Sequence, residues 1–148
     1  MAKVARRTPQ KTSPTVPDGI DAHRNTVRKM GGFFGIALSI AVLLVGLLLL
    51  VLPGSITGVL GFVLTVIALP TLPLFGVPAT GGFVRYFLSL ISSLLLWWVI
   101  GHYAARRAIQ SAISSWQEWL REFRPLAIGV VLGSIISLAL AAAVLGVI

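Results

Sequence analysis

The chain contains no cysteine, and acidic residues are almost as scarce, with four among 148 residues. Without thiols it forms no disulfide, holds no iron–sulfur cluster and has no thiolate nucleophile. None of the four Asp and Glu residues lies in a long apolar segment. Metal binding and acid–base catalysis inside a membrane need ionisable groups at depth. We therefore predict no metal site, no cofactor and no catalytic residues, so the chain is not expected to be an enzyme.

Charge of either sign is missing from most of the chain. Between Gly31 and Tyr103 the one Lys, Arg, Asp or Glu residue is Arg85, and there is none from Pro125 to Ile148. Only 11% of the residues are charged and 57% are hydrophobic, whereas soluble domains carry roughly a quarter charged residues. Long uncharged apolar runs are typical of transmembrane helices. The predicted fold class is all-α, a polytopic helical membrane protein without a separate globular domain.

Three apolar segments are long enough to be full spans, namely 31–52, 83–104 and 126–148. At 1.5 Å per residue the first of them rises about 33 Å, enough to cross a hydrocarbon core of about 30 Å. Together with the segments between them they make up a predicted membrane domain over 31–148.

Residues 1–30 form a basic arm that precedes the first span, with seven Lys and Arg against two Asp. Pro9, Pro14 and Pro17 oppose helix formation in its first half, so we expect the arm to be partly disordered. Basic residues beside a first span stay on the cytoplasmic side. We expect a multi-pass protein of the cell membrane (plasma or inner membrane) with a cytoplasmic N-terminus. The small size and the basic, Ala-, Leu- and Val-rich composition suggest a bacterial source.

The segment 105–124 is amphipathic. Its apolar residues recur with helical spacing, from Ile109 through Trp116 to Phe123, and basic residues lie off that stripe. We predict one interfacial helix over 105–124 that lies flat in the headgroup region and bends at Pro125 into the last span. An ordinary solvated linker helix is the alternative. The predicted lipid-headgroup contacts are Arg106, Arg107, Arg121, Arg124, Trp116 and Trp119.

The apolar segment 53–76 leaves two topologies open. Its first part, Ile56 to Leu69, would rise only about 21 Å as a helix, and Pro70 and Pro73 follow it. If the segment re-enters without crossing, eleven of the twelve basic residues lie in the cytoplasm. If it crosses as a fourth span over 56–75, eight do. A re-entrant path requires that protein covers its proline-rich return, because lipid offers no hydrogen bonds.

Small residues repeat every four positions in two of the spans. The last span carries Gly129, Gly133, Ser137 and Ala141, and the first carries Gly31, Gly35 and Ser39. Such stripes let helix backbones approach closely in lipid. The stripe of the last span is the predicted partner interface, and packing inside the chain is the alternative.

These features favour a small non-catalytic accessory or assembly subunit of a larger membrane complex, whose partners are other membrane subunits and anionic lipids. The alternative is a homo-oligomeric membrane carrier, channel or lipid-handling protein. Nucleic acid is not an expected partner, because the basic residues flank the spans. Within the spans, His102 is the one His residue, and no second ligand accompanies it.

Overall fold

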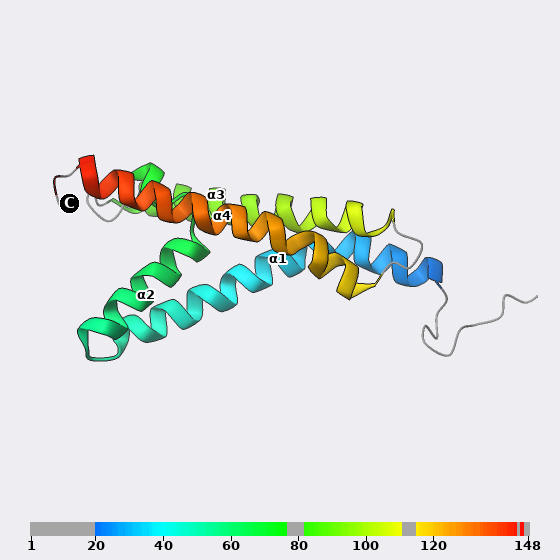
Figure 1. Cartoon of the computed structure of the whole chain (residues 1–148), viewed down its shortest axis with the longest axis horizontal. Helices are drawn as coiled ribbons and strands as arrows, with labels where there is room; N and C mark the ends of the chain where they lie inside the picture. The colour runs from blue at the N-terminus through cyan, green and yellow to red at the C-terminus, as the bar shows by residue number, and fades with distance from the viewer. Residues whose placement is uncertain (1–19, 77–81, 111–114, 145, 147–148) are drawn as a thin grey trace, which may run out of the picture.

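The computed structural model describes residues 20–76, 82–110, 115–144 and 146, and only the backbone of residues 20–23. Every regular element in these ranges is helical, which confirms the predicted all-α class (Figure 1). In chain order the elements are α1 (Ile20–Val51), α2 (Ser55–Ala68), the short 3₁₀ helix η1 (Pro73–Phe75), α3 (Phe83–Ala108) and α4 (Trp116–Val144).

Three helices, α1, α3 and α4, are long and apolar enough to cross a membrane. They contain 32, 26 and 29 residues, and even the shortest rises about 39 Å. Each extends beyond its predicted span: α1 begins at Ile20, α3 ends at Ala108 and α4 begins at Trp116. The additional turns carry polar and basic side chains, so the helices continue past the point where the apolar composition stops. Residues 1–19 of the predicted arm lie outside the described residues.

The segment 105–124 is not one helix, which corrects the predicted interfacial helix. Its beginning completes α3, its end from Trp116 starts α4, and residues 111–114 lie outside the described residues. At Pro125, where a bend into the last span was predicted, the helix is continuous, because α4 runs from Trp116 to Val144. Phe123 before the proline and Leu126 after it pack into the same apolar cluster. That shared packing offsets the helical hydrogen bond that the proline removes.

Helices α1 and α3 cross antiparallel at very short range, because glycines lie where they touch. A Cβ atom on Gly35 would collide with the carbonyl oxygen of Trp97, and one on Gly101 with that of Gly31. No side chain fits at these positions, so the two backbones are in direct contact. The small-residue stripe of the first span therefore packs inside the chain.

Helix α2 turns back along the second half of α1 and covers only part of its length. Gly54, with a φ of 134°, forms the turn between them. A Cβ on Gly61 would meet Leu50, so this pair of helices is also closely packed. With 14 residues α2 rises about 21 Å, and it ends at Ala68, hydrogen-bonded to Ser39 near the middle of α1.

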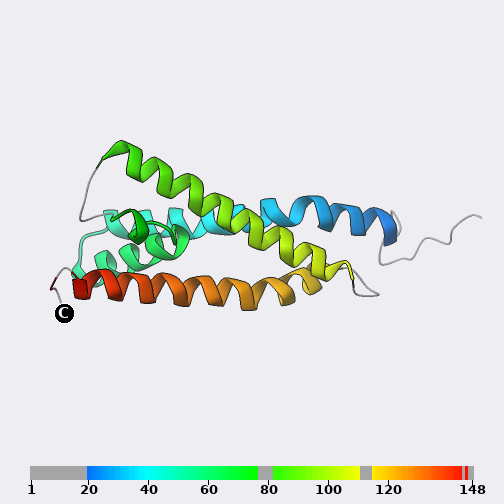
Figure 2. The same cartoon turned by 90° about the horizontal axis from the view of Figure 1, so that it is seen from above.

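After α2 the chain reverses, and 53–76 forms a half-length hairpin. It passes through Pro70 and η1, and α3 then begins at the end of the molecule where α1 finished (Figure 2). A fourth full-length helix over 56–75 is therefore not formed. The physical reason is Pro70, because the residue before a proline is disfavoured in a helix, and α2 ends at Ala68, two residues before Pro70.

Candidate functional site

The point where α2 ends is buried in the middle of the bundle. The carbonyl oxygen of Ala68 accepts two hydrogen bonds, from the Ser39 hydroxyl of α1 and from the Trp97 indole N–H of α3, each at 2.9 Å. Leu69 and Leu72, which follow, are also buried. A broken helix within a membrane needs such internal partners, since lipid provides none. The structure thus meets the condition for a re-entrant path.

A cluster of hydroxyl groups ties the return of the hairpin to α3. The Thr71 hydroxyl donates to the Ser89 carbonyl at 2.9 Å and lies 2.8 and 2.7 Å from the hydroxyls of Ser92 and Ser93. The Thr71 N–H donates to the Ser93 hydroxyl at 3.3 Å. The Ser89 hydroxyl is fully buried and is the one such group, among the described side chains, that has no hydrogen-bond partner. These hydrogen bonds hold the return of the hairpin against α3.

The hydroxyl cluster lacks the company that a serine nucleophile needs. His102 lies nine residues beyond Ser93 on α3, about 13 Å along the axis, and its ring stacks on Trp98 with centroids 5.2 Å apart. Two carboxylates belong to the described side chains, and both pair with arginines. Among the described residues no group of three His, Cys, Asp or Glu side chains could hold a metal ion. The absence of catalysis and of cofactors stays a prediction.

Residue-type patterns missed the contribution of Ser39, Trp97 and Thr71. The available signal was the presence of single hydroxyl residues inside apolar runs, since polar side chains within a span face the protein interior. That signal indicates which face of a helix is buried. It does not indicate the partner atoms. For Ser39 and Trp97 the partner is the Ala68 carbonyl at the end of α2, and for Thr71 the partners are a carbonyl and two hydroxyls inside α3.

Trp119, one of the predicted headgroup contacts, lies inside the protein. Its side chain is 3% exposed, its indole N–H donates to the Gly101 carbonyl at 3.0 Å, and its ring stacks on Phe123 at 4.7 Å. The structure therefore gives Trp119 a packing role between α3 and α4. Trp116 is half-buried, and its ring centroid lies 4.4 Å from that of Phe34.

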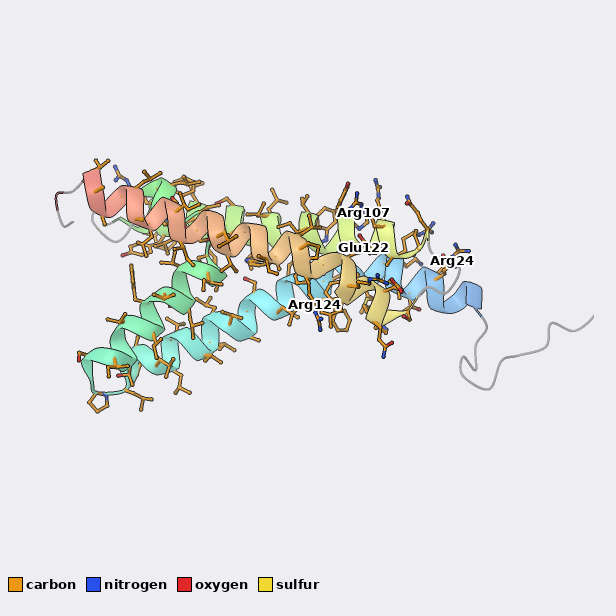
Figure 3. The ribbon with its side chains drawn as sticks, in the orientation of Figure 1. Arg24, Arg107, Glu122 and Arg124 are labelled. Carbon is orange, nitrogen blue, oxygen red and sulfur yellow. The ribbon has the colours of Figure 1, made fainter. Side chains whose placement is uncertain are left out.

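Basic side chains gather at one end of the bundle, where α1 starts, α3 finishes and α4 begins (Figure 3). Arg107 pairs with Glu122 at 3.6 Å and Arg121 with Glu118 at 3.9 Å; the arginines are exposed and the glutamates half-buried, so both pairs are of small energetic value. At the opposite end, Arg85 is the single basic residue among the described side chains. The described Lys and Arg residues of the basic end are Arg24, Arg28, Lys29, Arg106, Arg107, Arg121 and Arg124.

All four arginines that were predicted to contact lipid headgroups are exposed in the structure. They lie at one end of the bundle, on α3 and α4, so all four could face the same membrane surface. Contact with lipid itself stays a prediction.

The predicted partner stripe on α4 is open. A Cβ on Gly129 or on Gly133 would meet no atom within 4 Å, in contrast with the glycines of the α1–α3 crossing. Ser137 and Ala141 are half-buried. A mainly apolar groove of about 230 Å³ lies between the hairpin return, α3 and α4, and two residues of the stripe, Gly133 and Ser137, form part of it. Its lining residues are Pro70, Thr71, Leu74, Leu96, Val130, Gly133, Ser134 and Ser137.

Comparison of the chain with models of protein families, with curated proteins and with solved structures gave no match.

Proposed function

We propose that the chain is a small non-catalytic accessory or assembly subunit of a larger membrane complex, held in the plasma or inner membrane by three spans. The observation that carries the proposal is the open stripe of α4. Gly31, Gly35 and Gly101 have a neighbouring helix against them, whereas a Cβ on Gly129 or Gly133 would meet no atom of the described residues within 4 Å. Small residues of this spacing favour close helix contact in lipid, so a helix of another subunit fits this face.

The orientation in the membrane follows from the distribution of charge in the proposal. Seven described Lys and Arg residues at one end, against Arg85 at the other, favour a cytoplasmic basic end. The N-terminus then lies in the cytoplasm, and the half-length hairpin 53–76 enters and leaves from the opposite side.

A homo-oligomeric carrier, channel or lipid-handling protein is the second candidate. It is favoured by the interrupted hairpin, since non-helical backbone at membrane depth is found where protein or a water-filled cavity covers it. Against it stands the mutual hydrogen bonding of Thr71 with Ser92 and Ser93, which occupies the polar groups that a pathway would offer.

Gly133→Leu tests the proposal directly. Leucine adds bulk at the centre of the open stripe, where a Cβ would meet no atom of the described residues within 4 Å, so we expect the chain to remain folded and the partner subunits to be lost on purification in mild detergent. The matched control is Ala139→Leu, an exposed position on the same helix and away from the stripe. It adds similar apolar volume and should leave co-purification unchanged.

Mass spectrometry of the co-purified proteins separates the candidates. Loss of heterologous subunits from the Gly133→Leu variant alone supports an accessory subunit. Loss of self-association, with no other subunit present in the unsubstituted protein, supports the homo-oligomer. Equal behaviour of the two variants would mean that the stripe is lipid-facing, and the accessory-subunit proposal would lose its main support.

A further inference from the structure

A second cavity, of about 340 Å³, lies at the basic end and is unrelated to the open stripe. It is lined by Arg24, Asn25 and Arg28 of α1 and by Ile109, just beyond the end of α3. We propose that this pocket binds the phosphate group of an anionic membrane lipid. The inference rests on the membrane placement in the proposed function, but it needs no protein partner.

The position of the pocket fits the headgroup level. Arg28 lies one turn before Gly31 and Gly32, where α1 becomes apolar and packs on α3. Ile109 follows the last turn of α3 at the same end. Arg24 of the pocket lies at the basic end of the bundle (Figure 3). The pocket is thus at the boundary between the apolar length of the bundle and this end, where lipid phosphates lie beside a spanning helix.

The geometry holds two guanidinium groups on one side of α1. Arg24 and Arg28 are four residues apart, so their side chains lie on the same helix face. Arg24 is fixed in place by the hydrogen bond from its Nη2 to the Ile109 carbonyl, at 2.6 Å. Asn25 adds an amide with two further N–H donors. A planar guanidinium presents paired donors that match phosphate oxygens.

The charge balance of this pocket favours an anion. Asp21 precedes Arg24 by three residues, whereas no Asp or Glu lies within four residues of Arg28 in the sequence. The two described carboxylates, Glu118 and Glu122, are on α4 and pair with Arg121 and Arg107. A phosphate in the pocket would offset the charge of Arg28 and accept its N–H groups.

The test compares two charge-removing substitutions at neighbouring positions. Arg28→Gln removes a pocket guanidinium, and Lys29→Gln removes an exposed charge next to it that does not line the pocket. Native mass spectrometry of the full chain, titrated with phosphatidylglycerol or phosphatidylcholine, measures the affinity of the first bound lipid. We expect Arg28→Gln to weaken phosphatidylglycerol binding by about tenfold or more, since charge-assisted hydrogen bonds are lost. Lys29→Gln removes only the general surface attraction, worth less than about fivefold.

Three results would overturn the proposal. Equal weakening by the two substitutions would show general surface electrostatics in place of a pocket. Equal affinity of the unsubstituted chain for phosphatidylglycerol and phosphatidylcholine would exclude an anionic ligand. Displacement of the lipid by millimolar inorganic phosphate would identify a site for soluble phosphate. None of these outcomes affects subunit binding through Gly133, so a failure here and a failure of the proposed function are distinguishable.

Discussion

At the scale of single residues, glycine has two different roles in this protein although its spacing is the same. In α1, Gly31 and Gly35 lie against α3, where nothing larger than hydrogen fits. In α4, Gly129 and Gly133 lie in open space. The four-residue periodicity of the sequence identified both stripes as helix faces made of small residues. It could not assign one to internal packing and the other to the exterior, because that depends on which helix is adjacent.

Gly35→Ala should destabilise the protein, and Gly129→Ala should not. The added methyl group at Gly35 would strike the Trp97 carbonyl oxygen, and overpacking of this kind costs about 1–3 kcal/mol. At Gly129 there is room, and replacing a helical glycine by alanine gains up to about 1 kcal/mol. Thermal unfolding of both variants in the same detergent, followed by tryptophan fluorescence, measures the difference. Equal melting temperatures would contradict the close α1–α3 contact.

The tryptophans also show where residue-level prediction stops. Helical spacing predicted an apolar face that includes Trp116 and is bordered by Trp119. Helical periodicity does not say whether lipid or protein covers the face. In the structure α1 and α3 cover it: the Trp116 ring centroid lies 4.4 Å from that of Phe34 in α1, and the indole N–H of Trp119 donates to the Gly101 carbonyl of α3.

At the scale of the elements, the hairpin of α2 and η1 depends on its two neighbouring helices. Its length and its prolines predict that a helix over Ile56–Leu69 is too short to cross, and the structure agrees. The stabilising contacts were beyond prediction, because they join residues that are distant in the sequence: Ser39 and Trp97 are each 29 positions from Ala68. The boundaries of the long helices were also missed, since local composition marks the apolar core and helices continue past it.

A double-mutant cycle tests this anchoring of α2. Ser39→Ala or Trp97→Phe alone leaves the Ala68 carbonyl one hydrogen bond, and each should cost about 1 kcal/mol. The double variant leaves a buried carbonyl with no partner, which adds an unmet desolvation cost of about 1–3 kcal/mol beyond the sum. Unfolding in mixed detergent would measure the coupling. Strict additivity would mean that the two bonds do not share one acceptor.

Trp98→Phe is the control for loss of an indole in the same turn of α3. Trp98 is 37% exposed, and its substitution should show no coupling with Ser39→Ala. Coupling of Trp98 with Ser39 would indicate a general effect of tryptophan loss on α3.

At the scale of the whole molecule, the bundle has one strongly basic end and one nearly uncharged end. The sequence places the basic residues in the arm 1–30 and in the segment 105–124, but it left open whether both lie at one end, because that depends on whether 53–76 crosses. The fold then decides which of these clusters lie together. Because the hairpin is half-length, the end of α3 lies beside the start of α1, where the Arg24 side chain donates a hydrogen bond to the Ile109 carbonyl.

Single cysteines in this cysteine-free chain test the resulting topology. Gln110→Cys, at the basic end, should resist a membrane-impermeant thiol reagent in intact cells and react after permeabilisation. Ser55→Cys, at the opposite end, should react in intact cells. Both positions are exposed, so a negative result reflects the side of the membrane. Labelling of Gln110→Cys in intact cells would place the end of α3 outside and would require four crossings.

In the sequence, Ala68 lies midway between its two hydrogen-bond donors, and this order matters during synthesis. Ser39 leaves the ribosome before Ala68. Trp97 follows Ala68 by 29 residues, which takes about 1.5–6 s at ordinary rates of synthesis. During that interval the nascent hairpin has α1 alone to cover its broken end. Ser39 can therefore donate the first hydrogen bond to the end of α2 during membrane insertion, and Trp97 adds the second one once α3 has been made.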